Sequence, residues 1–256
     1  MIHPTAIIDP RAAIHAECEI GPYVVVDGPV KIGRATRVMA HATLLGWTEI
    51  GEENEIHPGA VLGDAPQDKA YAGTETYLKI GSRNIVREYV QIHRGTAPGS
   101  STVVGNENYL MAGAHVGHNC RLGDQIVLAN GALLAGYVEV GDRAFISGNC
   151  VVHQFVRVGE LSLMRGLSGA SRDVPPYSIV DWQHTVRGVN VVGLKRAGLE
   201  EQKIRRLKEA FRVLFRKGRN LGLAVRELEA KKDLAPEVQT LLEFIKTSKR
   251  GVCFGD

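Results

Sequence analysis

Aliphatic residues recur at every sixth position between residues 2 and 164. In three registers, the series is Ile2, Ile8, Ile14, Ile20, Val26, Ile32, Val38, Leu44, Ile50, Ile56, Leu62; Ile80, Val86, Ile92; and Val104, Leu110, Val116, Leu122, Leu128, Leu134, Val140, Ile146, Val152, Val158, Met164. Three such hexads make an 18-residue coil, which buries its aliphatic column only by stacking on the coils beside it. The pattern predicts an all-β, parallel β-helix of hexapeptide repeats. External loops are expected near residues 64–79 and 94–102, where the series breaks.

A second inward column lies four residues after each aliphatic residue and is mostly small. It contains Cys18, Cys120 and Cys150, so we expect these cysteines to be small interior residues without a reactive role. The four cysteines show no paired spacing that would indicate a disulfide framework. The start of the chain, MIHPTAIIDPR, has an early charge and no apolar segment, so we expect no signal peptide and a cytoplasmic setting.

The hexad period ends at DVPPY (173–177), where two prolines cannot donate to a strand ladder. A helical period follows over 200–218, and two further helices are expected near 221–232 and 236–248. The sequence therefore predicts a β-helix over residues 1–190 and a small α-helical domain over 191–256. The first part has 15 basic and 19 acidic residues and the second has 16 and 9, so an acidic partner is expected for the helical domain.

The stretch AHVGHNC (114–120) places His115 and His118 three residues apart. In an extended segment their side chains face opposite ways, which argues against one metal ion bound by both. Residues 18 apart lie above one another, so His118 should be followed up the wall by Gly136 and Gln154. A base beside an open backbone N–H suits acyl transfer, although an exposed wall also tolerates these residue types. No Ser or Cys shows a base partner in the sequence, so a covalent acyl-enzyme is not expected.

Six motifs, taken together, resemble the UDP-N-acetylglucosamine O-acyltransferase family of lipid A biosynthesis. They are IHRGT (92–96), AHVGHNC (114–120), LANGALLAG (128–136), VHQF (152–155), DVPPY (173–177) and GVNVVGLKRAG (188–198), and QDKAYAG (67–73) matches that family's external loop. The resemblance implies a left-handed β-helix and a homotrimer with active sites between subunits. It also implies transfer of a 3-hydroxyacyl group from acyl carrier protein to the sugar 3-hydroxyl, without metal or cofactor.

By the same resemblance, His118 is the general base and Gly136 supplies the oxyanion N–H. Asp68 and His93 would hold the sugar, and His115 would line the site. The nucleotide side would be served by His153, Gln154 and Arg196. Gly166 and His184 match positions along the acyl groove. Acyl carrier protein is expected to dock on a cluster of basic residues in the helical domain: Lys195, Arg205, Arg206, Arg212 and Arg216.

Four residues depart from the family pattern: Asn119 replaces Asp, Ala70 replaces a loop Lys, Tyr137 replaces His, and Ala197 replaces the second Arg of KRRG. Because Asn119 is neutral, we expect His118 to be oriented by another acceptor, a backbone carbonyl or a neighbouring chain's carboxylate. N-acyl transfer to a 3-amino analogue of the sugar remains an alternative, since an amine also loses a proton. A scaffold or nucleic-acid-binding solenoid is a third interpretation, weakened because no aromatic residues alternate with the basic ones. We expect neither nucleic-acid binding nor integral membrane association.

Overall fold

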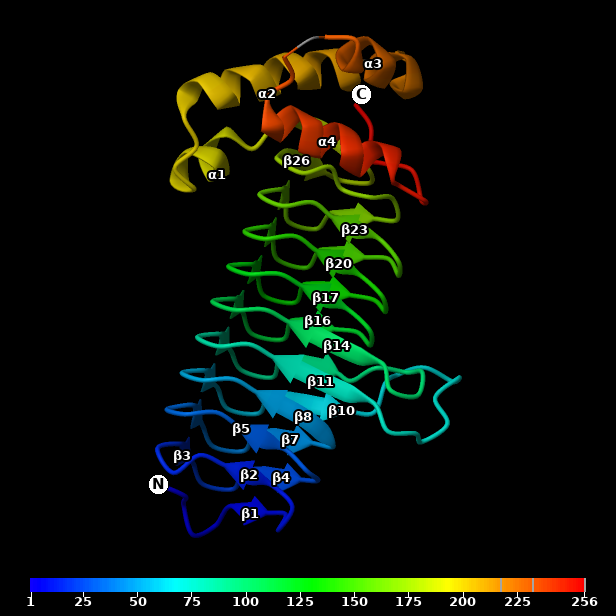
Figure 1. Ribbon diagram of the computed structural model, residues 1–256. Coiled ribbons are helices and arrows are strands. Elements are labelled where there is room, and N and C mark those ends of the chain that lie inside the picture. The colour runs from blue at the N-terminus through cyan, green and yellow to red at the C-terminus, as the bar shows by residue number, and fades with distance from the viewer. Residues whose placement is uncertain (217, 232, 256) are drawn as a thin grey trace.

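The computed structural model describes residues 1–216, 218–231 and 233–255. Short strands form a tall column that rises from the N-terminus, and helices cover its far end (Figure 1). Over the described residues the strands form three sheets of nine, eight and ten strands, in which every strand except the last two of the third sheet, β26 and β27, pairs with the strand three places away in sequence. The structure therefore confirms the parallel β-helix predicted from the hexad series.

The strands of the three sheets have the following bounds. The first sheet contains β1 (Ile7–Ile8), β4 (Val25–Asp27), β7 (Thr43–Leu45), β10 (Val61–Asp64), β13 (Gln91–His93), β16 (His115–Val116), β19 (Leu133–Leu134), β22 (Val151–Val152) and β25 (Gly169–Ala170). The second contains β2 (Ala13–Ile14), β5 (Lys31–Ile32), β8 (Trp47–Ile50), β11 (Tyr77–Ile80), β14 (Ser101–Val104), β17 (Arg121–Leu122), β20 (Glu139–Val140) and β23 (Arg157–Val158). The third contains β3 (Glu19–Ile20), β6 (Arg37–Val38), β9 (Glu55–Ile56), β12 (Ile85–Val86), β15 (Tyr109–Leu110), β18 (Val127–Leu128), β21 (Phe145–Ile146), β24 (Leu163–Met164), β26 (Ser178–Asp181) and β27 (Thr185–Val189).

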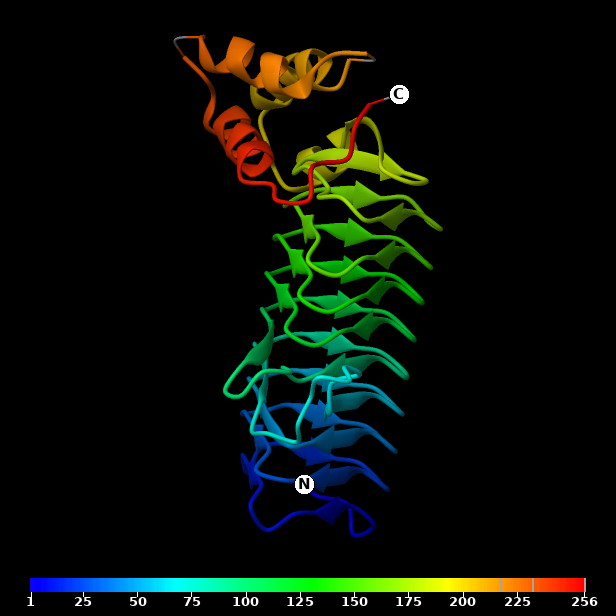
Figure 2. The same ribbon diagram turned by 90° about the vertical axis from the view of Figure 1, so that its right-hand side faces the viewer.

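The strand register shows how the coils accommodate two insertions. Most pairs are 18 residues apart, as for Ile8 and Val26. Between β10 and β13 the separation is 30 residues, and between β13 and β16 it is 24. The excess of 12 and 6 residues forms two external loops, over 65–76 and 94–100, which project from one edge of the column (Figures 1 and 2). They occur where the sequence predicted loops.

The interior is the aliphatic column and the small column that the sequence predicts. Every aliphatic position of the series from Ile20 to Met164 is buried, and so are Cys18, Cys120 and Cys150. Burial raises the pKa of the Cys120 thiol to about 12, which keeps it protonated and unreactive near neutral pH.

The upper end differs from the expectation that the solenoid stops at DVPPY. β26 follows this motif and still pairs in parallel with β24, and only β27 turns back antiparallel. The prolines therefore precede one more coil strand, and the antiparallel pair closes the third sheet. The C-terminal segment also returns to the column, where Asp173 forms a bridge with Val252.

Four helices follow the strands: α1 (Val191–Arg196), α2 (Glu201–Leu214), α3 (Leu221–Glu229) and α4 (Pro236–Lys246). The last three confirm the predicted helices, whereas the short α1 was not predicted. Helix α2 buries Ile204, Leu207 and Phe211 and contacts α3, α4 and β27. These contacts remove the apolar stripe of α2 from water. No helix among the described residues is long and apolar enough to cross a membrane.

Candidate active site

His118 lies in the corner that follows β16, where the chain passes from the first sheet to the second. Its ring nitrogen Nδ1 is 3.0 Å from Oδ1 of Asn119. The same oxygen accepts a hydrogen bond of 3.0 Å from the backbone N–H of Thr96, in the second external loop. The backbone N–H of Asn119 in turn donates to Oγ1 of Thr102 at 2.8 Å. Asn119 is therefore held on both sides, in a left-handed conformation (φ 61°) that Asn tolerates well.

These contacts determine which nitrogen of His118 carries the proton. A peptide N–H can only donate, so the Asn119 atom that faces Thr96 must be the amide oxygen. Since this oxygen also faces Nδ1, that nitrogen must be the donor, and in the neutral ring the lone pair therefore lies on Nε2. The expectation that an acceptor other than Asn119 orients His118 is wrong within the described residues, because a neutral amide performs this role.

Asp68 approaches the other side of the ring. Its Oδ2 is 3.6 Å from His118 Nε2, and its Oδ1 accepts a hydrogen bond from the backbone N–H of Ala70 at 2.9 Å. With the proton on Nδ1, both facing atoms are acceptors. The two atoms therefore do not bond to each other, and the Nε2 lone pair can accept a hydrogen bond from a hydroxyl that lies beside the pair. Once Nε2 has taken a proton, the same carboxylate can stabilise the imidazolium.

Gly136 stacks on His118, as the 18-residue spacing predicts. A Cβ atom placed on Gly136 would lie 2.5 Å from both Cε1 and Nε2 of the imidazole, so only glycine fits here without displacing the ring. The N–H of Gly136 has no acceptor among the described residues. A free N–H beside a base is the arrangement that stabilises a developing oxyanion. Beside Gly136, in the neighbouring column, lies Tyr137, whose ring centre is 5.3 Å from that of His118.

His93 and His115 form a second pair, with ring centres 5.1 Å apart. His93 Nδ1 donates to the Ala65 carbonyl at 2.7 Å, which leaves Nε2 as an acceptor. This Nε2 is buried and has no partner among the described residues, so it is available for a hydroxyl or amide donor of a ligand. Burial, with a smaller contribution from His93, lowers the pKa of His115 to about 4 and keeps that ring neutral.

A cavity of about 720 Å³ extends along the first sheet above His115. Its wall is mainly aliphatic, with Leu133, Leu134, Val151 and Val152, and three histidines also line it. The sequence-predicted residues found here are His115, His153 and His184, whereas Gln67, Ser171 and Gln183 were missed. A mainly apolar cavity that extends over several coils and contains a few polar groups suits an acyl chain with a polar substituent.

Ser171 and His184 meet at the upper end of this cavity, a contact that the sequence did not indicate. Ser171 Oγ lies 2.7 Å from His184 Nε2. However, this nitrogen also accepts the Ser171 backbone N–H at 3.0 Å, so its lone pair is shared. Burial, and secondarily the Arg172 cation, lowers the pKa of His184 and makes it a weaker base. The pair is therefore a poor nucleophile and base.

Three other predicted site residues lie apart from His118 within this chain. Gln154 is exposed and lines neither large cavity. Gly166 is also exposed and lies outside both cavities, although its match had placed it on the acyl groove. Arg196, on α1, lines a separate cavity of about 500 Å³ beside the third sheet. A single chain does not bring these residues to the base.

The predicted docking residues are exposed on α1, on α2 and, for Arg216, just after α2. These residues, Lys195, Arg205, Arg206, Arg212 and Arg216, form no ion pair with any described residue. Lys195 and Arg205 line a common hollow together with Lys208 and Glu201. Three cations thus face one carboxylate there, which leaves a net positive charge available to a partner. The described residues contain no group of three or more His, Cys, Asp or Glu placed to hold a metal ion.

Comparisons with known proteins agree on one family. Residues 173–253 match the family model described as UDP N-acetylglucosamine O-acyltransferase, domain 2. The chain is 44% identical, over 254 residues and 98% of both chains, to a Thermodesulfovibrio yellowstonii protein named acyl-(acyl-carrier-protein)--UDP-N-acetylglucosamine O-acyltransferase. A Syntrophobacter fumaroxidans protein of the same name is similar to the same extent.

Solved structures are similar over the whole chain. A UDP-N-acetylglucosamine acyltransferase from Bacteroides fragilis superposes with a TM-score of 0.94 at 39% identity, covering 98% of this chain and 99% of the other. The corresponding enzyme of Francisella novicida gives a TM-score of 0.93 at 38% identity, covering 100% and 94%. The likeness thus includes both the β-helix and the terminal helices.

Proposed function

The chain belongs to the UDP-N-acetylglucosamine O-acyltransferase family, and we propose that His118 is the general base with which it transfers a 3-hydroxyacyl group from acyl carrier protein to the 3-hydroxyl of UDP-N-acetylglucosamine. Its β-helix is the left-handed one of that family. The family's reaction is the first step of lipid A biosynthesis. The observation that carries the proposal is the pair of hydrogen bonds on Asn119 Oδ1, which selects the neutral tautomer of His118 whose lone pair lies on Nε2.

The proposed step is a direct attack on the thioester. The sugar hydroxyl donates to Nε2, beside the carboxylate of Asp68. As the oxygen attacks the thioester carbonyl, its proton passes to Nε2 and the carbonyl oxygen gains negative charge. The Gly136 N–H is the proposed donor to this oxyanion, and Asp68 stabilises the imidazolium. Collapse of the intermediate releases the carrier thiol, which takes back the proton from Nε2.

Substrate placement follows from the polarity of the walls. The aliphatic cavity above His115 is proposed to take the acyl chain, because burying its methylenes contributes about 0.8 kcal/mol each. The unpartnered Nε2 of His93 is proposed to accept a hydrogen bond from the sugar. Direct transfer is preferred to an acyl-enzyme, since the lone pair of His184 is shared between two donors.

We infer that Arg196 acts on the active site of a second copy of the chain, whereas His153 lines the same cavity as His115 within one chain. Because Arg196 lines a different cavity from His115, we propose a homotrimer in which one subunit's third sheet faces another's first sheet. The exposed, unpaired cations of α1 and α2 are proposed to dock acyl carrier protein in the cytoplasm. Their uncompensated charge supports an acidic partner.

The test is a transfer assay with purified protein and 3-hydroxyacyl carrier protein, in which mass spectrometry identifies the product. UDP-N-acetylglucosamine and its 3-amino analogue are offered separately. An ester product from the first sugar supports the proposal. Acylation of the amine alone would show N-transfer, and no product with either sugar, despite UDP-sugar binding, would contradict catalysis.

A further inference from the structure

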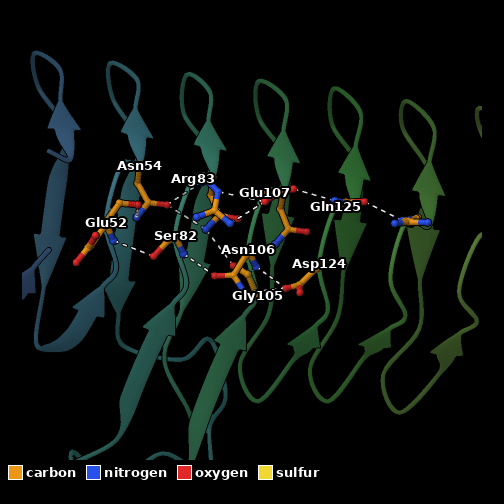
Figure 3. Close-up of polar contacts among 12 residues, drawn as sticks. Glu52, Asn54, Ser82, Arg83, Gly105, Asn106, Glu107, Asp124 and Gln125 are labelled. Atoms are coloured by element: carbon orange, nitrogen blue, oxygen red, sulfur yellow. Dashed lines mark hydrogen bonds and ion pairs between the residues drawn. The ribbon is translucent and has the colours of Figure 1, made fainter. Parts of the chain in front are cut away.

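A ladder of polar side chains runs up the corners between the second and third sheets. Figure 3 shows Arg83, Glu107 and Gln125 in successive coils, joined along the column. Arg83 donates to Glu107 Oε1 through Nε (3.1 Å) and Nη2 (2.7 Å). Gln125 Nε2 donates to Glu107 Oε2 at 2.8 Å, and Gln125 Oε1 accepts from Nε of Arg143 at 2.7 Å. The ladder therefore ends on the Arg143 guanidinium.

The ladder fixes the position of Arg143 without neutralising it. A carboxylate can only accept and a guanidinium can only donate, so both contacts of Gln125 define its amide orientation. Arg83, followed by Gln125, lowers the pKa of Glu107, whose negative charge is thus balanced by Arg83. Arg143 meets only the neutral amide, and it forms no ion pair among the described residues. With Nε engaged, its two terminal nitrogens remain free to donate.

Arg143 and Arg196 line the same cavity of about 500 Å³, one from the β-helix and one from α1. Phe145 and Leu163 supply apolar wall between them, and Ala197 adds no charge. Neither arginine has a carboxylate partner among the described residues. Two unpaired guanidinium groups beside an apolar wall suit a ligand that has both a flat apolar part and phosphate groups.

We propose that Arg143, positioned by Gln125, is a second phosphate-binding arginine that acts with Arg196 on the diphosphate of the UDP-sugar. This inference rests on the proposed function. Arg143 comes from a strand corner 53 positions before Arg196, so nothing in the KRAG motif itself indicates it. It supplies from the β-helix the second cation that Ala197 does not provide on α1.

The test is calorimetric titration of the full-length protein with UDP and, separately, with uridine. Arg143→Gln should weaken UDP binding about ten-fold, equal to about 1.4 kcal/mol, and leave uridine binding unchanged. Gln125→Glu keeps an acceptor for Arg143 Nε but adds a negative charge beside it, so UDP binding should weaken there too. The control is Arg121→Gln, which removes an exposed cation on β17, outside this cavity, and should leave UDP binding unchanged.

Equal UDP affinity in wild type and Arg143→Gln would overturn the inference, and so would a loss shared equally by UDP and uridine, which indicates a structural role. If only Arg143→Gln weakens UDP binding, the part assigned to Gln125 is wrong. A wild-type protein that acylates the UDP-sugar while Arg143→Gln binds UDP normally refutes this inference alone. A wild-type protein that neither binds UDP nor acylates the sugar refutes the proposed function as well.

Discussion

Replacing Gly136 with Ala should displace the base while leaving the oxyanion donor in place. The added Cβ would lie 2.5 Å from Cε1 and Nε2 of His118 and 3.1 Å from Cδ2. Ordinary carbon contacts are about 3.5–4.0 Å, so the ring must move by about 1 Å. A misplacement of about 1 Å can reduce turnover about 10²-fold. The backbone N–H survives the substitution, and Gly136 does not have a positive φ, so backbone strain does not contribute.

The measurement is kcat with saturating UDP-sugar and acyl carrier protein, together with the melting temperature. Gly148→Ala is the matched control, because its Cβ meets only the Asn130 carbonyl oxygen, at 3.4 Å, which is ordinary contact. The control should keep near-normal turnover, and both variants should melt close to wild type. If Gly136→Ala keeps more than about half of the wild-type kcat, the close stacking of Gly136 on the catalytic ring is not needed for the reaction.

Three further outcomes are expected. Asn119→Leu removes the acceptor for Thr96 and His118 and should lower kcat about 10–100-fold. Asn119→Asp can accept both hydrogen bonds and should remain active. Equal activity of the two variants would show that the acceptor is unimportant. The double variant Arg205→Glu, Arg206→Glu should raise KM for acyl carrier protein but not for the UDP-sugar, and added salt should have the same effect on the wild-type protein. Parallel changes in both KM values would refute docking at these residues. Because the pKa of His115 is lowered to about 4, the unfolded state binds more protons between about pH 6.5 and pH 4. The free energy of unfolding should therefore decrease as the pH is lowered through this window, and it should decrease less in His115→Gln. Urea midpoints at pH 7 and pH 5 measure both changes. Equal decreases in the two proteins would contradict the burial of this ring.

The fold followed from the sequence because each hexad repeats the same local requirement. Aliphatic residues at every sixth position are buried when the coils stack, and the 18-residue spacing of the coils then places Gly136 over His118. The two insertions were visible as breaks in the same series. The hexad period did not predict the upper end of the column, where β26 continues past Pro176 and β27 runs antiparallel. This closure depends on packing against α2.

The site was less predictable wherever contacts join distant loops. The role of Asn119 was misjudged, since its orientation depends on Thr96, a loop residue 23 positions away whose backbone N–H carries no sequence signal. The contact of Ser171 with His184 and the place of Arg143 depend likewise on side-chain directions. Arg143 had one usable signal: it stacks 18 residues above Gln125, in the corner column that begins with Arg83 and Glu107.

The central claim, that His118 is the general base, is tested most directly by the single-turnover rate of His118→Ala with bound UDP-N-acetylglucosamine and 3-hydroxyacyl carrier protein. General base catalysis contributes about 10²–10⁴-fold, so the rate should fall by that factor while UDP-sugar affinity and the oligomeric state stay as in wild type. A variant that keeps more than about a tenth of the wild-type rate would contradict the assignment of His118.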